Sequence, residues 1–135
     1  MSLHPQSTWS VPEETARVAR AAFPKGNPYM DMSDEMGTLY SDEMFRSLFP
    51  RRGRPATSPA RLALVLVMQF AENLTDRQAA DAVRGRIDWQ YALGLELAEP
   101  GFDFSVLSEF RDRLVAGQGE SLLLNAMLDR FQERG

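Results

Sequence analysis

Three arginines within five residues, Arg51-Arg52-Gly53-Arg54-Pro55, form the group in this sequence best suited to binding an anion. An arginine guanidinium carries a permanent positive charge and a planar set of donors that match phosphate oxygens. Gly53 lets the backbone approach a surface closely, and Pro55 restricts Arg54 to an extended conformation. The spacing therefore predicts an extended basic loop that can contact a phosphate backbone or a narrow minor groove.

Two interpretations of this loop stay open from the residues alone. An extended Arg-Gly-Arg-Pro is similar to the minor-groove core of an AT-hook, whereas a solvated basic linker would have the same composition. The charge distribution favours phosphate binding, because residues 46–92 hold eight arginines against four acids although the chain has a net charge of −4. A basic middle between acidic ends can bind phosphates locally, or it can dock on another part of the protein.

A second candidate for nucleic-acid contact is a predicted helix over residues 105–115. At about 100° per residue, its buried stripe consists of Val106, Leu107, Phe110 and Leu114. The side chains that could reach base edges or phosphates are Ser105, Ser108, Arg111 and Arg113. Glu109 and Asp112 also face outward and would repel phosphates. A recognition helix and a surface helix stabilised by a Glu109–Arg113 pair are equally compatible with this pattern.

The elements that must position these residues are predicted to be helices. In the N-terminal part, Ser10 is expected to cap a helix that ends at Pro24, with the apolar positions Val11, Ala16, Ala19 and Phe23 on one face. Residues 24–33 contain Gly, Asn and Pro and are typical of a loop. Ser41 is expected to cap a short helix through Phe49.

The C-terminal two thirds of the chain shows the same pattern of capped helices. Ser58-Pro59 begins a helix to about Glu72, which is apolar on nearly every side and therefore belongs at the centre of the fold. The other predicted helices are 75–84, which a Thr75–Gln78 capping box begins; 88–94; 105–115, capped by Asp103 or Ser105; and 121–133. No paired-strand pattern accompanies them, so we expect an all-α protein.

Composition narrows the class of protein. A length of 135 residues fits a single domain over residues 1–135, and 44% hydrophobic with 25% charged residues is typical of a globular chain. The absence of cysteine excludes thiolate zinc sites and favours a reducing cytoplasm. His4 is the only histidine, so we expect no metal centre and no cofactor. The longest apolar run, 62–68, is too short to cross a bilayer, and the N-terminus lacks a signal-peptide pattern.

Several segments occur in a characteristic order along the chain. They are Leu48-Phe49-Pro50, Gly53-Arg54-Pro55, Glu72-Asn73-Leu74-Thr75-Asp76-Arg77-Gln78-Ala79-Ala80, Trp89-Gln90-Tyr91-Ala92-Leu93-Gly94-Leu95 and Phe102-Asp103-Phe104-Ser105-Val106-Leu107-Ser108-Glu109-Phe110-Arg111-Asp112-Arg113-Leu114. This set resembles the N-terminal domain of bacterial insertion-sequence transposases of the InsH type, over nearly the whole chain. The resemblance implies a domain that binds double-stranded DNA at the terminal inverted repeats of the element and helps to pair subunits.

In such transposases this region precedes a ribonuclease-H-like domain with an Asp-Asp-Glu metal triad. The present sequence reaches Gly135 before any segment that is similar to the first catalytic strand, so we expect no nuclease activity from this chain. Related transposases often have more basic residues in the helix that corresponds to 105–115. This departure leaves the loop at Arg51, Arg52 and Arg54 as the stronger candidate for DNA contact.

The combined prediction is a compact multi-helix domain with a helix-turn-helix-like core over residues 59–115, interrupted by an insertion at 86–103. The alternative is a dimerisation or interaction module without DNA affinity of its own, which the acidic ends of the chain favour. The last predicted helix has an apolar surface wider than one buried face needs, so it is expected to pack on a partner, such as a second copy in a homo-oligomer, or on a catalytic domain. Its apolar residues are Leu122, Leu123, Leu124, Met127, Leu128 and Phe131. A small all-α enzyme is disfavoured, since no nucleophile–base or metal constellation is present.

Overall fold

The structure, a computed structural model, describes residues 9–36, 43, 45 and 58–117. Within these residues the chain forms six α-helices and no strand, which confirms the prediction of an all-α fold. The helices are α1 (Glu13–Ala22), α2 (Pro28–Met36), α3 (Pro59–Glu72), α4 (Asp76–Gly85), α5 (Ile87–Leu93) and α6 (Phe104–Ala116). The helices predicted over 41–49 and 121–133 lie outside the described residues, apart from Glu43 and Phe45.

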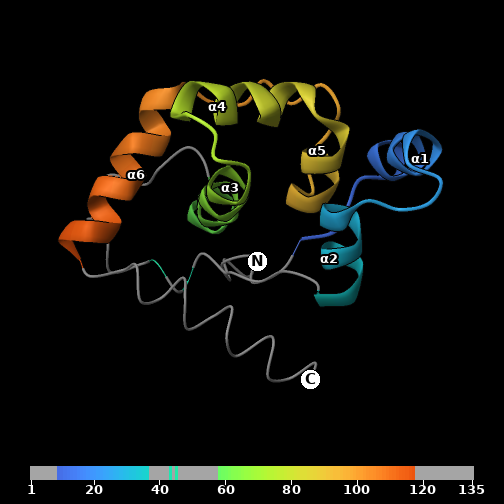
Figure 1. Ribbon diagram of the computed structural model, residues 1–135, viewed down its shortest axis with the longest axis horizontal. Helices are drawn as coiled ribbons and strands as arrows, with labels where there is room; N and C mark the ends of the chain where they lie inside the picture. The colour runs from blue at the N-terminus through green and yellow to red at the C-terminus, as the bar shows by residue number, and fades with distance from the viewer. Residues whose placement is uncertain (1–8, 37–42, 44, 46–57, 118–135) are drawn as a thin grey trace, which may run out of the picture.

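Helix α3 occupies the centre of the molecule, and α6, α4 and α5 surround it on three sides (Figure 1). Ser58 caps α3 as predicted, since its Oγ accepts a hydrogen bond from the backbone N–H of Arg61 at 3.3 Å. Asn73 is the C-cap, and its N–H bonds to the carbonyls of Gln69 and Phe70. Its left-handed φ of 57° turns the chain so that the N–H of Leu74 reaches the Gln69 carbonyl at 3.0 Å. These two caps fix the length of the most apolar helix.

The connections from α3 to α4 and from α4 to α5 are short and well determined by their residues. The Thr75–Gln78 capping box that begins α4 is present in both directions, with hydrogen bonds of 3.1 and 2.9 Å. A single residue, Arg86, separates α4 from α5, and Gly94 ends α5 with a φ of 65°. A Cβ at Gly94 would lie 2.3 Å from Cδ1 of Trp9, so both the backbone and the packing require glycine there.

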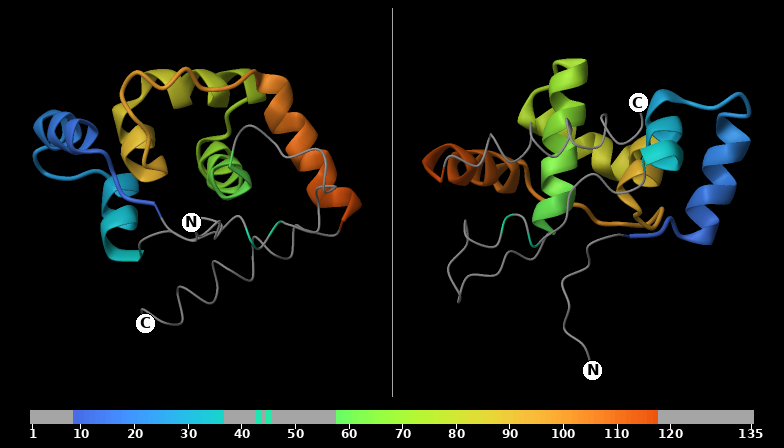
Figure 2. Two further views of the ribbon diagram at one scale, coloured as in Figure 1. Left: turned by 180° about the vertical axis from the view of Figure 1, so that it is seen from behind. Right: turned by 90° about the horizontal axis from the view of Figure 1, so that it is seen from below.

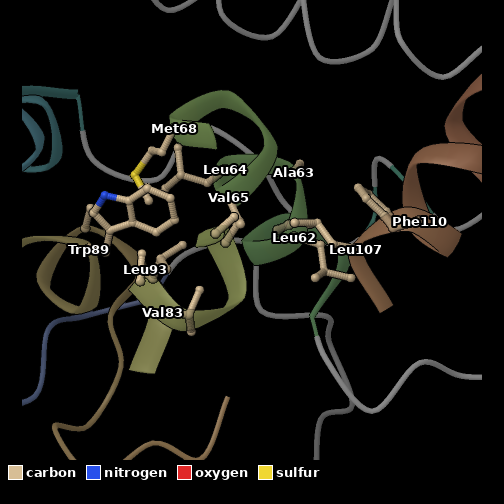
Figure 3. Packing of buried hydrophobic residues seen from close by; sticks show 14 of the residues in the cluster. Leu62, Ala63, Leu64, Val65, Met68, Val83, Trp89, Leu93, Leu107 and Phe110 are labelled. Atoms are coloured by element: carbon tan, nitrogen blue, oxygen red, sulfur yellow. The ribbon is translucent and has the colours of Figure 1, made fainter. Parts of the chain in front are cut away.

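The main hydrophobic core joins α3 to the three helices around it (Figure 3). Leu62, Val65 and Met68 of α3 are at most 1% exposed. Trp89 and Leu93 of α5 pack on one side of α3, and Leu107 and Phe110 of α6 pack on the other; Val83 of α4 also contributes. Because α5 is buried along its length from Asp88 to Leu93, it forms part of the core rather than of the surface.

Helices α1 and α2 pack mainly on α5, at the end of the molecule away from α6 (Figure 2). A second cluster of buried residues, Ala16, Ala19, Met30 and Tyr91, holds them there, with Val11, Phe23 and Ile87 packed against it. This cluster contains all the positions that the sequence placed on the apolar face of the first helix. Tyr91 adds polar contacts, because its hydroxyl accepts from Arg20 at 3.1 Å and donates to Asp34 at 2.5 Å.

Two predictions for this N-terminal part are wrong. The first helix begins at Glu13 after Pro12, and no side chain caps it, so Ser10 does not have the expected role. Residues 28–33, which were predicted as loop, belong to α2. The N-terminus of α2 is stabilised by Asn27, whose Oδ1 accepts from the N–H of Tyr29 at 3.0 Å and whose carbonyl accepts from the N–H of Asp31 at 2.8 Å. Asn27-Pro28 is therefore a helix start, with proline at the first helical position.

Candidate nucleic-acid interface

Helix α6 begins at an exposed polar turn. Asp103 is its N-cap, and its carboxylate accepts from the N–H of Ser105 at 3.0 Å and from the Ser105 hydroxyl at 2.6 Å. Of the two predicted caps, Asp103 and not Ser105 is therefore the N-cap of α6. The hydrogen bonds from Ser105, together with the charges of Arg77 and Arg84, hold the pKa of Asp103 below its usual value. Ser105 is exposed, but its hydroxyl is already used as a donor within this turn.

The faces of α6 follow the predicted pattern. Leu107, Phe110 and Leu114 are buried, and Val106 is half-buried at the edge of the stripe. On the opposite face Ser105, Glu109 and Asp112 are exposed, while the half-buried Ser108 donates its hydroxyl to the Ser105 carbonyl at 3.4 Å. The outward face of α6 therefore presents hydroxyls together with two carboxylates, which makes its centre unfavourable for a phosphate.

The two arginines of α6 that the sequence singled out do not lie together. Residues two positions apart on a helix point about 160° away from each other. Arg111 is turned toward α4, where Nη1 and Nη2 donate to Oδ1 and Oδ2 of Asp76 at 2.8 and 2.7 Å. This pairing raises the pKa of Arg111 and lowers the pKa of Asp76. Arg113 lies on the other flank of α6 and is exposed.

Two arginines of α4 that the sequence analysis did not single out lie beside the start of α6. The guanidinium of Arg77 is 4.2 Å from the centre of the Phe104 ring, which is a cation–π contact. Arg84 donates from Nη1 to the Phe102 carbonyl at 3.3 Å and forms an ion pair with Asp81. Both arginines are exposed. Their spacing of seven residues, which places them on the same side of a helix, is the signal in the sequence that could have identified them.

Two other arginines of the basic middle segment hold the fold together. Arg61 donates to the carbonyls of Leu93 and Gly94 at 2.7 and 3.3 Å, and thus binds the C-terminus of α5. Arg86 pairs with Asp88 at 2.8 Å and with Glu72 at 2.6 Å, and its guanidinium is 5.3 Å from the centre of the Trp89 ring. The excess of arginine in residues 46–92 therefore overstates the positive charge that is open to a ligand.

The loop that carried the main prediction, with Arg51, Arg52 and Arg54, lies outside the described residues. Of the other predicted contacts, the structure brings Ser105 and Ser108 together on one turn of α6, and it separates Arg111 from Arg113. The arrangement at this end of the molecule is thus a polar helix start flanked by Arg77 and Arg84, with two acids further along the same helix.

Residues 17–113 match the family described as Transposase domain (DUF772). The match begins within α1, includes α2 to α5 and reaches almost to the end of α6. The chain belongs to this transposase-domain family. The resemblance drawn from the ordered motifs is thereby confirmed at the level of the family. No curated protein and no solved structure matches the chain.

The described residues of this transposase domain contain neither a cluster of potential metal ligands nor a helix suited to a membrane. Among the described residues, no three or more His, Asp or Glu side chains are grouped so that they could hold a metal ion. None of the six helices in the part of the chain that the structure describes combines the length and the apolar character that a membrane span requires.

Proposed function

We propose that this chain is the DNA-binding part of an insertion-sequence transposase, that it recognises the terminal inverted repeats of the element, and that it is not catalytic by itself. The observation that carries the proposal is the match of residues 17–113 to a transposase domain. The basic middle of the chain supports it, because local clusters of arginine bind DNA phosphates even in a protein with a net negative charge. The lack of cysteine supports a location in the reducing cytoplasm, where chromosomal DNA of bacteria lies.

The arrangement of α3, α4 and α6 supports a helix-turn-helix-like interpretation of this core. Only Asn73, Leu74 and Thr75 separate α3 from α4, and a three- to four-residue turn is typical of that motif. The two helices cross at a steep angle in Figure 1. The first of them is buried over residues 62–65 and 68–69, while α4 and α6 both keep an exposed side. In this interpretation, residues 86–103, which include the buried α5, would be the insertion between α4 and α6.

The contacts that we propose fall into two sets. Arg51, Arg52 and Arg54 supply most of the affinity through phosphates or a minor groove, and Arg77 and Arg84 add phosphate contacts beside the start of α6. Ser105, Ser108 and Arg113 of α6 are the candidates for groove contacts that depend on the base sequence. Arg111 is already engaged by Asp76 and is considered below.

Binding of the full chain to DNA tests this proposal. Selection from a random-sequence duplex library should enrich a sequence that matches the inverted repeats at the ends of the encoding element. Replacing Arg51, Arg52 and Arg54 by alanine should flatten the slope of log affinity against log salt by about two to three units, because each lost phosphate contact removes about 0.9. Replacing Arg77 and Arg84 should flatten it by up to about two units.

Arg17 provides the matched control. It is an exposed arginine that pairs with Glu14 three residues away, as Arg84 pairs with Asp81, but it lies on α1 at the other end of the molecule (Figure 2). Arg17→Ala should leave the slope unchanged. If the triple variant binds the selected duplex with the affinity and slope of the wild type, the proposed contact site is wrong. If the intact chain enriches no sequence, recognition of inverted repeats is wrong.

One observation favours the alternative function, an interaction module without DNA affinity. Phe70 on α3 is 89% exposed, although this helix contributes more residues than any other to the main hydrophobic core. Single exposed apolar residues are common, but a large aromatic on the central helix is a suitable anchor for a partner. Sedimentation velocity of wild type and Phe70→Gln over a concentration series tests this function, which requires association by the wild type and its loss in the variant.

A further inference from the structure

Side chains from three helices meet at a single carboxylate, that of Asp76. Its Oδ1 accepts from Nε2 of Gln69 at 2.8 Å and from Nη1 of Arg111 at 2.8 Å, and its Oδ2 accepts from Nη2 of Arg111 at 2.7 Å. Gln69 also donates to the carbonyl of Leu74 at 3.1 Å. The cluster therefore joins α3 through Gln69, the connecting turn through Leu74, the first residue of α4 through Asp76, and α6 through Arg111.

The cluster around Asp76 gives α6 a directional contact, which its apolar contacts do not provide. Leu107, Phe110 and Leu114 determine which face of α6 is buried, but apolar burial has no directional preference and leaves a small rotation of the helix about its axis open. A bidentate pair between arginine and carboxylate has a fixed, planar geometry. Arg111 lies about 60° around the helix from Ser108, so the orientation of one determines the direction in which the other points.

The partners of Arg111 also make it poorly suited to contact DNA directly. Turning its guanidinium toward a phosphate would remove both donors from Asp76. The carboxylate of Asp76 would then keep Gln69, which is 9% exposed, as its remaining side-chain donor among these residues. Leaving a partly buried carboxylate without its cation is costly, and a free carboxylate near the DNA would also repel phosphates.

We infer that Arg111 is a positioning residue. Through Asp76 and Gln69 it fixes the rotation of α6 relative to the turn between α3 and α4. This rotation determines how Ser105 and Ser108 are presented to DNA. This inference rests on the proposed DNA-binding function and assigns a specific part to one residue of that site. A direct phosphate contact by Arg111 would have the opposite consequence for Asp76→Asn: this substitution would then strengthen binding to DNA, whereas a positioning role predicts that it weakens binding.

The experiment compares Arg111→Lys, Arg111→Ala and Asp76→Asn in the full chain. Affinities are measured for the duplex selected by the wild type and for a scrambled duplex, over a salt series, at a temperature where melting curves show each variant fully folded. A positioning role predicts that all three variants lose roughly five- to hundredfold in affinity for the selected duplex, which is the range for one to a few lost base contacts. Binding to the scrambled duplex should change far less, and for Arg111→Ala the salt slope should stay within about half a unit of the wild type.

A phosphate contact by Arg111 predicts a different pattern. Lysine would then keep most of the affinity, alanine would flatten the salt slope by about 0.9, and Asp76→Asn would strengthen binding because it frees Arg111. Asp81→Asn is the matched control for loss of a carboxylate, since Asp81 pairs with Arg84 on the exposed side of the same helix. It should strengthen binding to both duplexes, in contrast to Asp76→Asn.

The outcomes separate the inference from the function on which it rests. Tighter binding by Asp76→Asn, or a flattened slope for Arg111→Ala, overturns the positioning role while the proposed function stands. Variants that melt at lower temperature but bind both duplexes like the wild type when folded also overturn it, since the cluster is then structural only. A wild type that does not distinguish the two duplexes overturns the proposed function, and the positioning role with it.

Discussion

Arg86→Ala should cost about 2 to 3 kcal/mol of unfolding free energy, although its position in the basic segment makes it a natural candidate for DNA contact. Its guanidinium forms ion pairs of 2.8 Å with Asp88 and 2.6 Å with Glu72, and it lies 5.3 Å from the centre of the Trp89 ring. Asp88 is the critical partner, because its side chain is only 5% exposed and cannot regain water when Arg86 is removed.

The magnitude follows from the burial of the two partners. Removing one member of a fully buried ion pair costs roughly 3 to 5 kcal/mol. Arg86 is 37% exposed, and the Asp88 carboxylate keeps two other donors, the N–H of Trp89 at 2.9 Å and the Asn27 amide at 3.3 Å. Both facts reduce the cost below that range. Loss of about 2 to 3 kcal/mol would still be a large part of the stability of a domain of this size.

Urea denaturation of the full chain, followed by circular dichroism, measures this loss. Arg17→Ala is the control, because its pair with Glu14 is exposed and should contribute little to stability. The double variant Arg86→Ala, Asp88→Asn should be more stable than the sum of the two single changes predicts, since the uncompensated charge is then gone. The argument is refuted if Arg86→Ala destabilises the protein no more than Arg17→Ala does.

Three further predictions use the same folded chain. Phe110→Ala should cost about 3 to 5 kcal/mol in urea denaturation, because Phe110 is 2% exposed, whereas Phe70→Gln should stay within about 0.5 kcal/mol; equal losses would contradict the core described here. Arg111 and Arg86 lower the pKa values of Asp76 and Glu72 in the folded protein. The stabilisation from these two pairs should therefore be fully present above about pH 5 and should decrease as the carboxyls become protonated at lower pH. Asp76→Asn should weaken this pH dependence of the unfolding free energy, which denaturation at low pH measures. If the segment 121–133 mediates self-association, Leu124→Glu should abolish the dimer in sedimentation velocity without reducing helicity, and an unchanged dimer would exclude that segment as the interface.

The sequence predicted the helices well where their ends are determined by local chemistry. Ser58-Pro59, Thr75 with Gln78, and Gly94 act through contacts within a few residues, and all of them have the predicted role. Asn27-Pro28 carries the same kind of signal, but it lies in a segment whose Gly and Pro content is typical of a loop, and α2 was therefore missed. The stability of α2 depends on its packing against α5, from a distant part of the chain, which local patterns do not contain.

The candidate site was less predictable, because it depends on which side chains the fold has already engaged. The pattern of α6 correctly separates its buried and exposed faces, but it cannot show that Arg111 pairs with Asp76, thirty-five positions earlier. Arg77 and Arg84 were not singled out in the sequence, because their relevance depends on a contact with another helix. Their significance comes from the start of α6, which the tertiary structure places beside α4.

The arginines of the basic segment thus fall into two groups that sequence position does not distinguish. Arg61 and Arg86 bind carbonyls or carboxylates in the interior contacts of the fold, so their replacement should change stability first and DNA affinity only as a consequence. Arg77 and Arg84 lie on the exposed side of α4, so their replacement should change the salt dependence of binding and leave stability nearly unchanged. A count of positive charge along the chain treats these four residues as equivalent. Only the contacts of each guanidinium decide which of them can release a counterion from DNA, and the number of such arginines sets the upper limit on the electrostatic part of the affinity.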